Sequence, residues 1–307
     1  MRNLTRRRAL LGLGGACLGS VCGLLGLARS VRGREATEGA ARRVVCLDLL
    51  LTETLLTLDF PPLAVGNVPL YRRLVALPAI PDGTSDLGPF QEPNLELLQA
   101  LAPDLILAPA WLKAGRAPFA RIAPVVWLQT FSKEIGALDN AETLLRHIAR
   151  LTGREAALGQ ILQRRDRVFE RARNDLTGDA DRPLLVVRFM EDGRHAAVFG
   201  GKGMIGGVLG RLGLRNAWTG RTNVWGVISI GIEQLAAFPE ARLVHFDRGE
   251  ETARALEQLD ASPLWHALPM VRAGRVLAMP VVYPNGGLFS AMRFAEQLAE
   301  ILPGKLR

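Results

Sequence analysis

The sequence predicts an α/β fold in which two lobes, each with a mainly parallel sheet, are joined by one long helix, with a ligand cleft between the lobes. Between residues 140 and 176, apolar residues recur at helical spacing, from Leu144 and Ile148 to Phe169 and Ala172. On both sides of this segment, short apolar runs alternate with helical patterns, which is typical of parallel sheets. The chain has 307 residues, enough for two lobes with cores of their own.

The central segment divides the chain. A break at Thr152 and Gly153 separates two helical stretches, and a helix from Arg154 to Leu176 would extend about 35 Å at ~1.5 Å per residue. We therefore expect an N-terminal lobe at 43–138, a connecting helical segment at 139–176 and a C-terminal lobe at 183–307. The alternative is an ordinary surface helix inside one large domain.

Residues 1–28 are typical of a targeting segment. Arg6, Arg7 and Arg8 precede a glycine-containing apolar run, a twin-arginine pattern that predicts export of a folded protein to the periplasm. Two alternatives are a lipoprotein anchored through Cys17 or Cys22, although their flanking residues fit poorly, and an uncleaved membrane anchor. Cys46 is the remaining cysteine, so no intrachain disulfide forms once the leader is removed.

The charge of the chain does not indicate nucleic-acid binding. The formal net charge is +8, but the first 28 residues hold four arginines and no acid, which leaves 34 basic and 30 acidic residues elsewhere. These basic residues are dispersed and do not cluster with aromatic residues. We therefore expect no nucleic-acid partner.

Each lobe contains several short apolar runs that predict strands. The hairpin expected in the second lobe turns at Asp192 and Gly193. Expected strands are 44–50, 63–66, 105–108 and 125–128 in the first lobe, and 184–190, 195–199, 243–247 and 275–279 in the second. Expected helices include 92–101, 204–212, 232–237, 253–259 and 289–302.

No catalytic motif is evident: the chain has no GxSxG, no complete phosphate loop and no histidine pattern for a metal, so we expect neither an enzyme nor a resident cofactor. Open α/β sheets bind ligands beyond the carboxyl ends of their strands. Phe90, Trp111, Trp225 and Tyr283 lie near such ends and suit a ligand with a large apolar surface. Core packing is the alternative for these aromatic residues.

Several long segments resemble the periplasmic ferric-hydroxamate (ferrichrome-type) siderophore-binding proteins, the FhuD family. The resemblance rests on DLGPFQEPNLELLQALAPDLIL, NAWTGRTNVWG, SPLWHALPMVRAGRV and FSAMRFAEQL, in order along nearly the whole chain after residue 42. It implies a monomeric solute-binding protein of the helical-backbone class that binds a ferric siderophore and delivers it to an inner-membrane ABC permease. Alternatives are another metal chelate, such as cobalamin, haem or ferric citrate, or an exported siderophore hydrolase.

The residues expected to form the ligand site depart from this family. A pocket arginine of the family aligns with Phe90, a tyrosine with Leu112 beside Trp111, and a serine with Val227, two residues after the retained Trp225. A late aromatic cluster becomes Tyr283, Pro284 and Asn285. The expected ligand-binding residues are therefore Phe90, Trp111, Leu112, Trp225, Val227, Tyr283 and Asn285.

One further residue, Arg188, is expected to replace the missing arginine toward an anionic chelate. It follows the buried run 184–187 and lies near a strand's carboxyl end, where an unpaired arginine is costly. The alternative is a salt bridge to Glu191 or Asp192, and Lys113, Arg116 and Arg221 are lesser candidates. For permease docking, the family's second-lobe acid matches Glu233.

Overall fold

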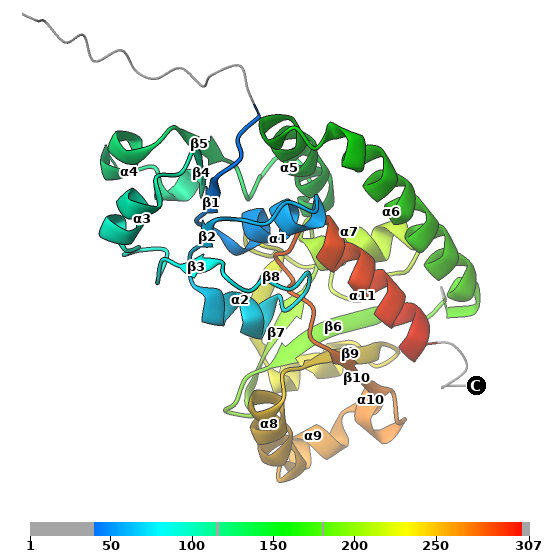
Figure 1. Cartoon of the computed structure of the whole chain (residues 1–307). Helices are drawn as coiled ribbons and strands as arrows, with labels where there is room; N and C mark the ends of the chain where they lie inside the picture. Colours follow the sequence, from blue (N-terminus) through cyan, green and yellow to red (C-terminus); the bar gives the residue numbers. More distant parts are fainter. Residues whose placement is uncertain (1–39, 115–116, 180, 303–307) are drawn as a thin grey trace, which may run out of the picture. The chain divides into compact units, whose positions relative to one another are not determined.

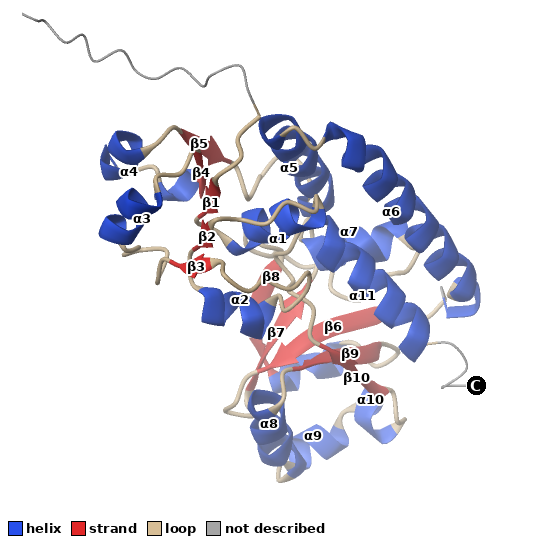
Figure 2. Cartoon of the chain, in the orientation of Figure 1, coloured by secondary structure: helices blue, strands red, loops and turns tan. Residues whose placement is uncertain are grey.

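The computed structural model describes residues 40–114, 117–179 and 181–302. The predicted leader at 1–28 and the candidate Arg116 lie outside these ranges. The strands form two separate groups with helices around each (Figure 2). Among the described residues, no helix is long and apolar enough to cross a membrane.

The first sheet is parallel throughout, as predicted. Its strand order is β3-β2-β1-β4-β5, and each neighbouring pair is parallel. Its apolar strands β1 and β4 are buried along their whole length, as expected when helices cover both faces of a sheet. The strands are β1 (Val44–Cys46), β2 (Ala64–Val65), β3 (Ser85–Asp86), β4 (Leu105–Pro109) and β5 (Val125–Leu128).

The second sheet, of order β10-β9-β6-β7-β8, is mixed. The pairs β6–β9 and β9–β10 are parallel, whereas β6–β7 and β7–β8 are antiparallel. The predicted hairpin turning at Gly193 is confirmed, and a turn this short permits only antiparallel pairing. The strands are β6 (Leu184–Phe189), β7 (His195–Phe199), β8 (Val227–Gly231), β9 (Arg242–Asp247) and β10 (Val276–Pro280).

Helices cover these sheets and connect them. The first sheet is accompanied by α1 (Leu49–Thr57), α2 (Val68–Leu74), α3 (Leu95–Leu101), the 3-10 turn η1 (Ala110–Leu112) and α4 (Ala117–Ile122). The connection contains α5 (Ala137–Thr152), α6 (Glu155–Asp175) and the turn η2 (Thr177–Asp179). The remainder are α7 (Met204–Arg211), η3 (Ile232–Ala237), α8 (Glu250–Asp260), α9 (Pro263–Ala267), α10 (Pro269–Arg272) and α11 (Leu288–Ile301).

The connecting segment holds two helices, with the break where the sequence predicts it. Gly153 ends α5 in the left-handed conformation, at φ 66°, which glycine adopts without steric cost. The longer helix α6 has 21 residues and extends about 32 Å at ~1.5 Å per residue. It lies alongside α11 (Figure 1), and its buried face includes Phe169 and Ala172.

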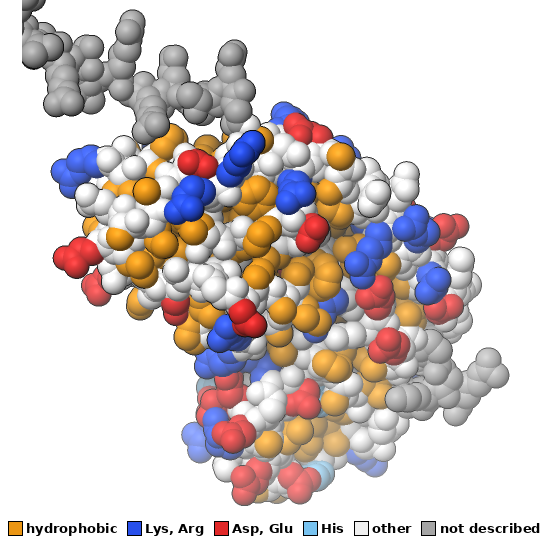
Figure 3. All heavy atoms as spheres, in the orientation of Figure 1, with side chains coloured by type: hydrophobic (Ala, Val, Ile, Leu, Met, Phe, Trp, Pro, Cys, Tyr) orange, Lys and Arg blue, Asp and Glu red, His pale blue; other side chains and the backbone are white. Residues whose placement is uncertain are grey.

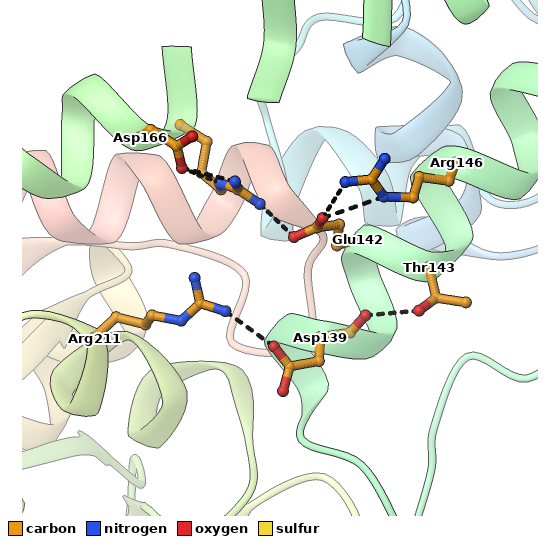
Figure 4. Close-up of polar contacts among 7 residues, drawn as sticks. Asp139, Glu142, Thr143, Arg146, Asp166 and Arg211 are labelled. Atoms are coloured by element: carbon orange, nitrogen blue, oxygen red, sulfur yellow. Dashed lines mark hydrogen bonds and ion pairs between the residues drawn. The ribbon is translucent and has the colours of Figure 1, made fainter. Parts of the chain in front are cut away.

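Ion pairs tie α5 to its neighbours (Figure 4). The Glu142 carboxylate of α5 accepts hydrogen bonds from Arg146 one turn later and from Arg165 of α6. Asp139, in the first turn of α5, pairs with Arg211 of α7 at 3.0 Å. The connecting helices are therefore attached to each other and to a second-lobe helix.

The hydrophobic core runs from one sheet to the other. One cluster of buried side chains contains Ile106 of β4, Leu145 of α5, Val244 of β9 and Phe294 of α11. A second cluster lies on the other face of β6, where Leu185 and Val187 alternate with Leu184 and Val186 of the first cluster. The lobe boundaries at 43–138 and 183–307 remain a prediction, because the apolar packing is continuous between the sheets.

One predicted strand is too long. The apolar run 44–50 was expected to be a strand throughout, but β1 ends at Cys46 and α1 begins at Leu49. The reason is Asp48, whose Oδ1 accepts the backbone N–H groups of Leu50 and Leu51 and caps the helix.

Candidate functional site

A cavity of about 950 Å³ lies between the two lobes. This volume is at the upper end of the roughly 300–1,000 Å³ usual for small-molecule sites. Its lining includes residues that follow strands of both sheets, among them Asp48 after β1, Trp111 after β4 and Tyr283 after β10. The cavity therefore lies at the carboxyl ends of strands, where open α/β sheets bind ligands.

Three aromatic side chains from the first lobe line this cavity. Phe90 packs its ring over Gly66, where a Cβ would lie 2.7 Å from the ring, so only glycine fits beneath it. Trp111 belongs to η1 and is 49% exposed, and Phe131 lies in the loop after β5. An exposed tryptophan in a cavity offers a large apolar surface to a ligand and can stack on its planar groups.

The second lobe supplies Trp225 and Tyr283. Trp225 is 41% exposed and makes an edge-to-face contact with Phe131 of the first lobe, with ring centroids 5.4 Å apart. The Oδ1 atom of Asn223 accepts the backbone N–H groups of Trp225 and Val227, which fixes the turn that carries the indole. Aromatic side chains from both lobes thus meet at this site.

Polar groups line the inner part of the cavity. Asp48 is 9% exposed, and burial raises the pKa of its carboxyl group to about 6. The hydrogen bonds from two backbone N–H groups of α1 lower this pKa, but by less than burial raises it. Asn140, in the first turn of α5, donates to the carbonyl of Gln129 at 2.9 Å. Thr130 is buried, and within the described chain its hydroxyl has no hydrogen-bond partner.

Five of the expected ligand-binding residues line the cavity: Phe90, Trp111, Trp225, Tyr283 and Asn285. Leu112 and Val227 do not. The tight turn of η1 leaves Trp111 exposed while Leu112 packs into the core, and Val227 begins β8 beside the turn that presents Trp225. Contact of the five lining residues with a ligand stays a prediction.

Arg188 is not among the lining residues. It lies on β6 opposite Ala197, and its Nη2 atom is 3.5 Å from the sulfur of Met190. Burial lowers its pKa, as does the positive charge of Arg248, while Glu251 opposes both. The geometry therefore does not support Arg188 as a replacement for the family's pocket arginine.

The alternative partners expected for Arg188 are also engaged elsewhere. Glu191 pairs with Arg254 at 3.0 Å, and Asp192 pairs with His195 at 2.7 Å. Arg188 lies on the part of β6 that pairs with β7, one residue beyond the last residue that pairs with β9.

Sequence reasoning missed the loop after β5 and the residue after β1. Residues 129–135 and Asp48 all line the cavity. The loop 129–135 follows the predicted strand 125–128, so the rule that ligands bind at the carboxyl ends of strands already pointed to it. Asp48 was missed because the apolar run 44–50 predicts an uninterrupted strand, whereas β1 ends at Cys46.

Among the described residues, no cluster of three or more His, Cys, Asp or Glu side chains could hold a metal ion. The single cysteine they include, Cys46, is buried in β1, and burial raises its pKa above the ordinary value. Glu233, the expected docking residue, is exposed on η3.

Comparison with known sequences identifies the family of this chain and two of its relatives. Residues 44–283 match the family described as periplasmic binding protein. The iron(3+)-hydroxamate-binding protein FhuD of Escherichia coli is 34% identical over 263 residues, covering 86% of this chain and 88% of that protein. The Fe(3+) dicitrate-binding periplasmic protein FecB of the same organism is 26% identical over 281 residues, covering 88% and 87%.

Solved structures show the same fold. The siderophore-binding protein FhuD from Vibrio cholerae, bound to Fe3+-Desferal, matches with a TM-score of 0.80 and 30% identity, covering 87% of this chain and 99% of that one. The triscatecholate siderophore-binding protein FeuA from Bacillus subtilis matches with a TM-score of 0.68 at 19% identity, over 87% and 93% of the two chains. The second match carries information on the fold alone.

Proposed function

We propose that this chain, which belongs to the periplasmic binding protein family, binds an iron(III)–hydroxamate siderophore and delivers it to the permease of an ABC importer. The observation that carries this proposal is the cavity of about 950 Å³ between the lobes, with exposed tryptophans from both sides. Its family members are binding proteins, and we propose binding without catalysis here.

The shape and surface of the cavity suit a wrapped ferric chelate. In such a complex the siderophore supplies the iron ligands, so the protein needs apolar contacts to the organic shell and few polar groups. The aromatic lining from both lobes provides such contacts. Ferric citrate is the second candidate, because the dicitrate-binding relative matches slightly more of this chain, 88% against 86%, although at lower identity.

Tryptophan fluorescence tests the proposal. Titration of the purified protein with Fe3+-desferal should give saturable, one-to-one quenching, because Trp111 and Trp225 border the cavity. Replacing Trp225 with Phe should reduce the quenching. The matched change Trp218→Phe should not, because Trp218 packs against Phe238 away from the cavity lining.

Ferric citrate, haem and cobalamin form the competing arms of this titration. Saturable quenching by one of them, with none by ferric hydroxamates, would replace the proposed ligand. Absence of quenching by every chelate, together with turnover of a siderophore ester, would replace binding with catalysis.

We further propose export to the periplasm by the twin-arginine route, function as a monomer, and docking to the permease through Glu233. Replacing Arg6 and Arg7 with lysine should retain the protein inside the cell if the route is correct.

Glu233→Ala should impair uptake of the chelate while the affinity of the protein for the chelate stays unchanged, since this exposed residue is not part of the cavity lining. A loss of affinity in Glu233→Ala would instead assign that residue to the ligand site or the fold.

A further inference from the structure

Charged side chains are few in the lining of the cavity. Among the described residues that line it, Asp48 and Glu134 are acidic, and Lys133 is the single basic residue. Lys133 and Glu134 are exposed neighbours, so solvent and their opposite signs weaken their effect on a ligand. Asp48 is 9% exposed, so the charge that the cavity holds away from water is negative.

The Asp48 carboxylate has unused capacity to accept hydrogen bonds. Its Oδ1 atom accepts the N–H groups of Leu50 and Leu51 at 2.8 and 3.1 Å. The described groups that donate to this carboxylate, the N–H groups of Leu50 and Leu51, bond to Oδ1 and leave Oδ2 for other donors. Since a carboxylate offers about four acceptor positions, a ligand N–H or ammonium group can be received here.

Thr130 is a second, independent sign of a polar ligand group. It is 4% exposed and lines the same cavity, yet no described residue forms a hydrogen bond with its Oγ1 atom. A buried hydroxyl without a partner is costly, and a bound molecule that supplies the partner relieves that cost. The inner wall thus presents a carboxylate and an unpaired hydroxyl, and no guanidinium among the described lining residues.

We propose that the cavity selects ferric hydroxamates with no net negative charge, and that Asp48 is the residue that sets this preference. The inference rests on the proposed function and narrows its ligand class. Three hydroxamate groups neutralise Fe3+, so the net charge of such a complex comes from its side groups. An anionic side group placed near a buried carboxylate is repelled, whereas an ammonium group is attracted.

Three ferric complexes that share one iron-binding core test the proposal. Fe3+-desferal carries a terminal ammonium group and a net charge of about +1; N-acetylation makes the complex neutral, and N-succinylation makes it anionic. We expect the protein to bind the cationic complex about tenfold more tightly than the anionic one, with the neutral complex between them.

Asp48→Asn is the informative variant. Asparagine caps helices as well as aspartate does, so α1 should form, and thermal unfolding checks this. The ratio of cationic to anionic affinity should fall to about twofold or less in this variant, while the neutral complex binds as before. The matched control, Glu96→Gln, removes an exposed carboxylate of α3 outside the cavity lining and should leave the ratio unchanged.

The outcomes separate this inference from the function on which it rests. If all three complexes bind with equal affinity, or if the anionic one binds most tightly, the inference is wrong while hydroxamate binding stands. An unchanged ratio in Asp48→Asn would overturn the assignment to Asp48. If none of the three complexes binds, the proposed function and the inference both fail.

Discussion

The junction between the lobes is built differently at α11 and between α2 and α8. At α11, Glu53 of α1 is fully buried and accepts the backbone N–H groups of Gly287 and Ser290 at 3.0 and 2.8 Å, as well as the Ser290 hydroxyl at 2.7 Å. At α2, Arg73 meets Glu251 of α8 at 3.5 Å, with side chains 61% and 26% exposed. One contact is buried and directional, and the other is a solvated ion pair.

The buried contact tolerates no extra atom. A Cβ added to Gly286 would lie 2.3 Å from the Ser290 hydroxyl oxygen and 2.6 Å from Oε2 of Glu53. Arg293 of α11 adds a bond to the carbonyl of Val75 at 3.1 Å. Together with the continuous apolar core, this predicts a stiff joint beside a preformed cavity, in which ligand binding requires little closure.

Removal of the Glu53 carboxylate tests the buried contact and should have the largest effect. Glu53→Ala leaves three buried donors without an acceptor, so we expect the free energy of unfolding to fall by about 3 kcal/mol, measured by urea denaturation. Glu53→Gln keeps an amide oxygen for the two backbone N–H groups and should lose only about 1 kcal/mol. An Ala variant as stable as the native protein would show that the lobes do not depend on this contact.

The pH dependence of stability sharpens the same point with a smaller effect. Burial raises the pKa of Glu53 to about 7 from its ordinary value of 4.5, although the bonds from Ser290 and Gly287 and the charge of Arg293 lower it. The folded chain therefore holds this proton more tightly than the unfolded chain does. The resulting stabilisation is present below pH 4.5 and is lost as the pH rises through 7.

Urea denaturation of the native protein and Glu53→Gln at pH 5 and pH 8 measures this contribution. Between these pH values, the native protein should lose about 2 kcal/mol more than the variant. Asp48 also has a raised pKa, but it is present in both proteins and cancels in the comparison. Parallel pH profiles would mean that Glu53 titrates alike in the folded and unfolded chains.

The exposed ion pair between Arg73 and Glu251 should have the smallest effect. Arg73→Ala is expected to change the free energy of unfolding by less than about 0.5 kcal/mol, because exposed ion pairs contribute little.

X-ray scattering curves of the native protein with and without ligand should nearly overlay, because the joint at α11 is stiff. A clear decrease in the radius of gyration on binding would indicate that the lobes close and that the joint at α11 bends.

The secondary structure was largely predictable because its signals are local. Apolar spacing identified α6 and its buried face, and the turn at Gly193 identified the β6–β7 hairpin. The resemblance of several segments to siderophore-binding proteins predicted a family that the comparisons confirm.

Other features required the tertiary structure. The neighbours Trp111 and Leu112 have opposite environments, because one turn of η1 exposes the first and buries the second. Glu53 and Ser290 are 237 residues apart, so no local pattern pairs them. Arg188 looked suitable for a ligand from its place in the chain, yet the hairpin carries it away from the cavity lining.

The sequence by itself determined where the helices and strands form, since periodicity, capping and turn residues act over a few neighbouring positions. The tertiary structure decided which side chains meet. The placement of Asp48 and Thr130 in one cavity depends on the parallel pairing of β1, β4 and β5, which aligns the ends of strands distant in the chain. The charge that a ligand encounters is therefore a property of that alignment, because each residue's burial is set by elements far from it in sequence.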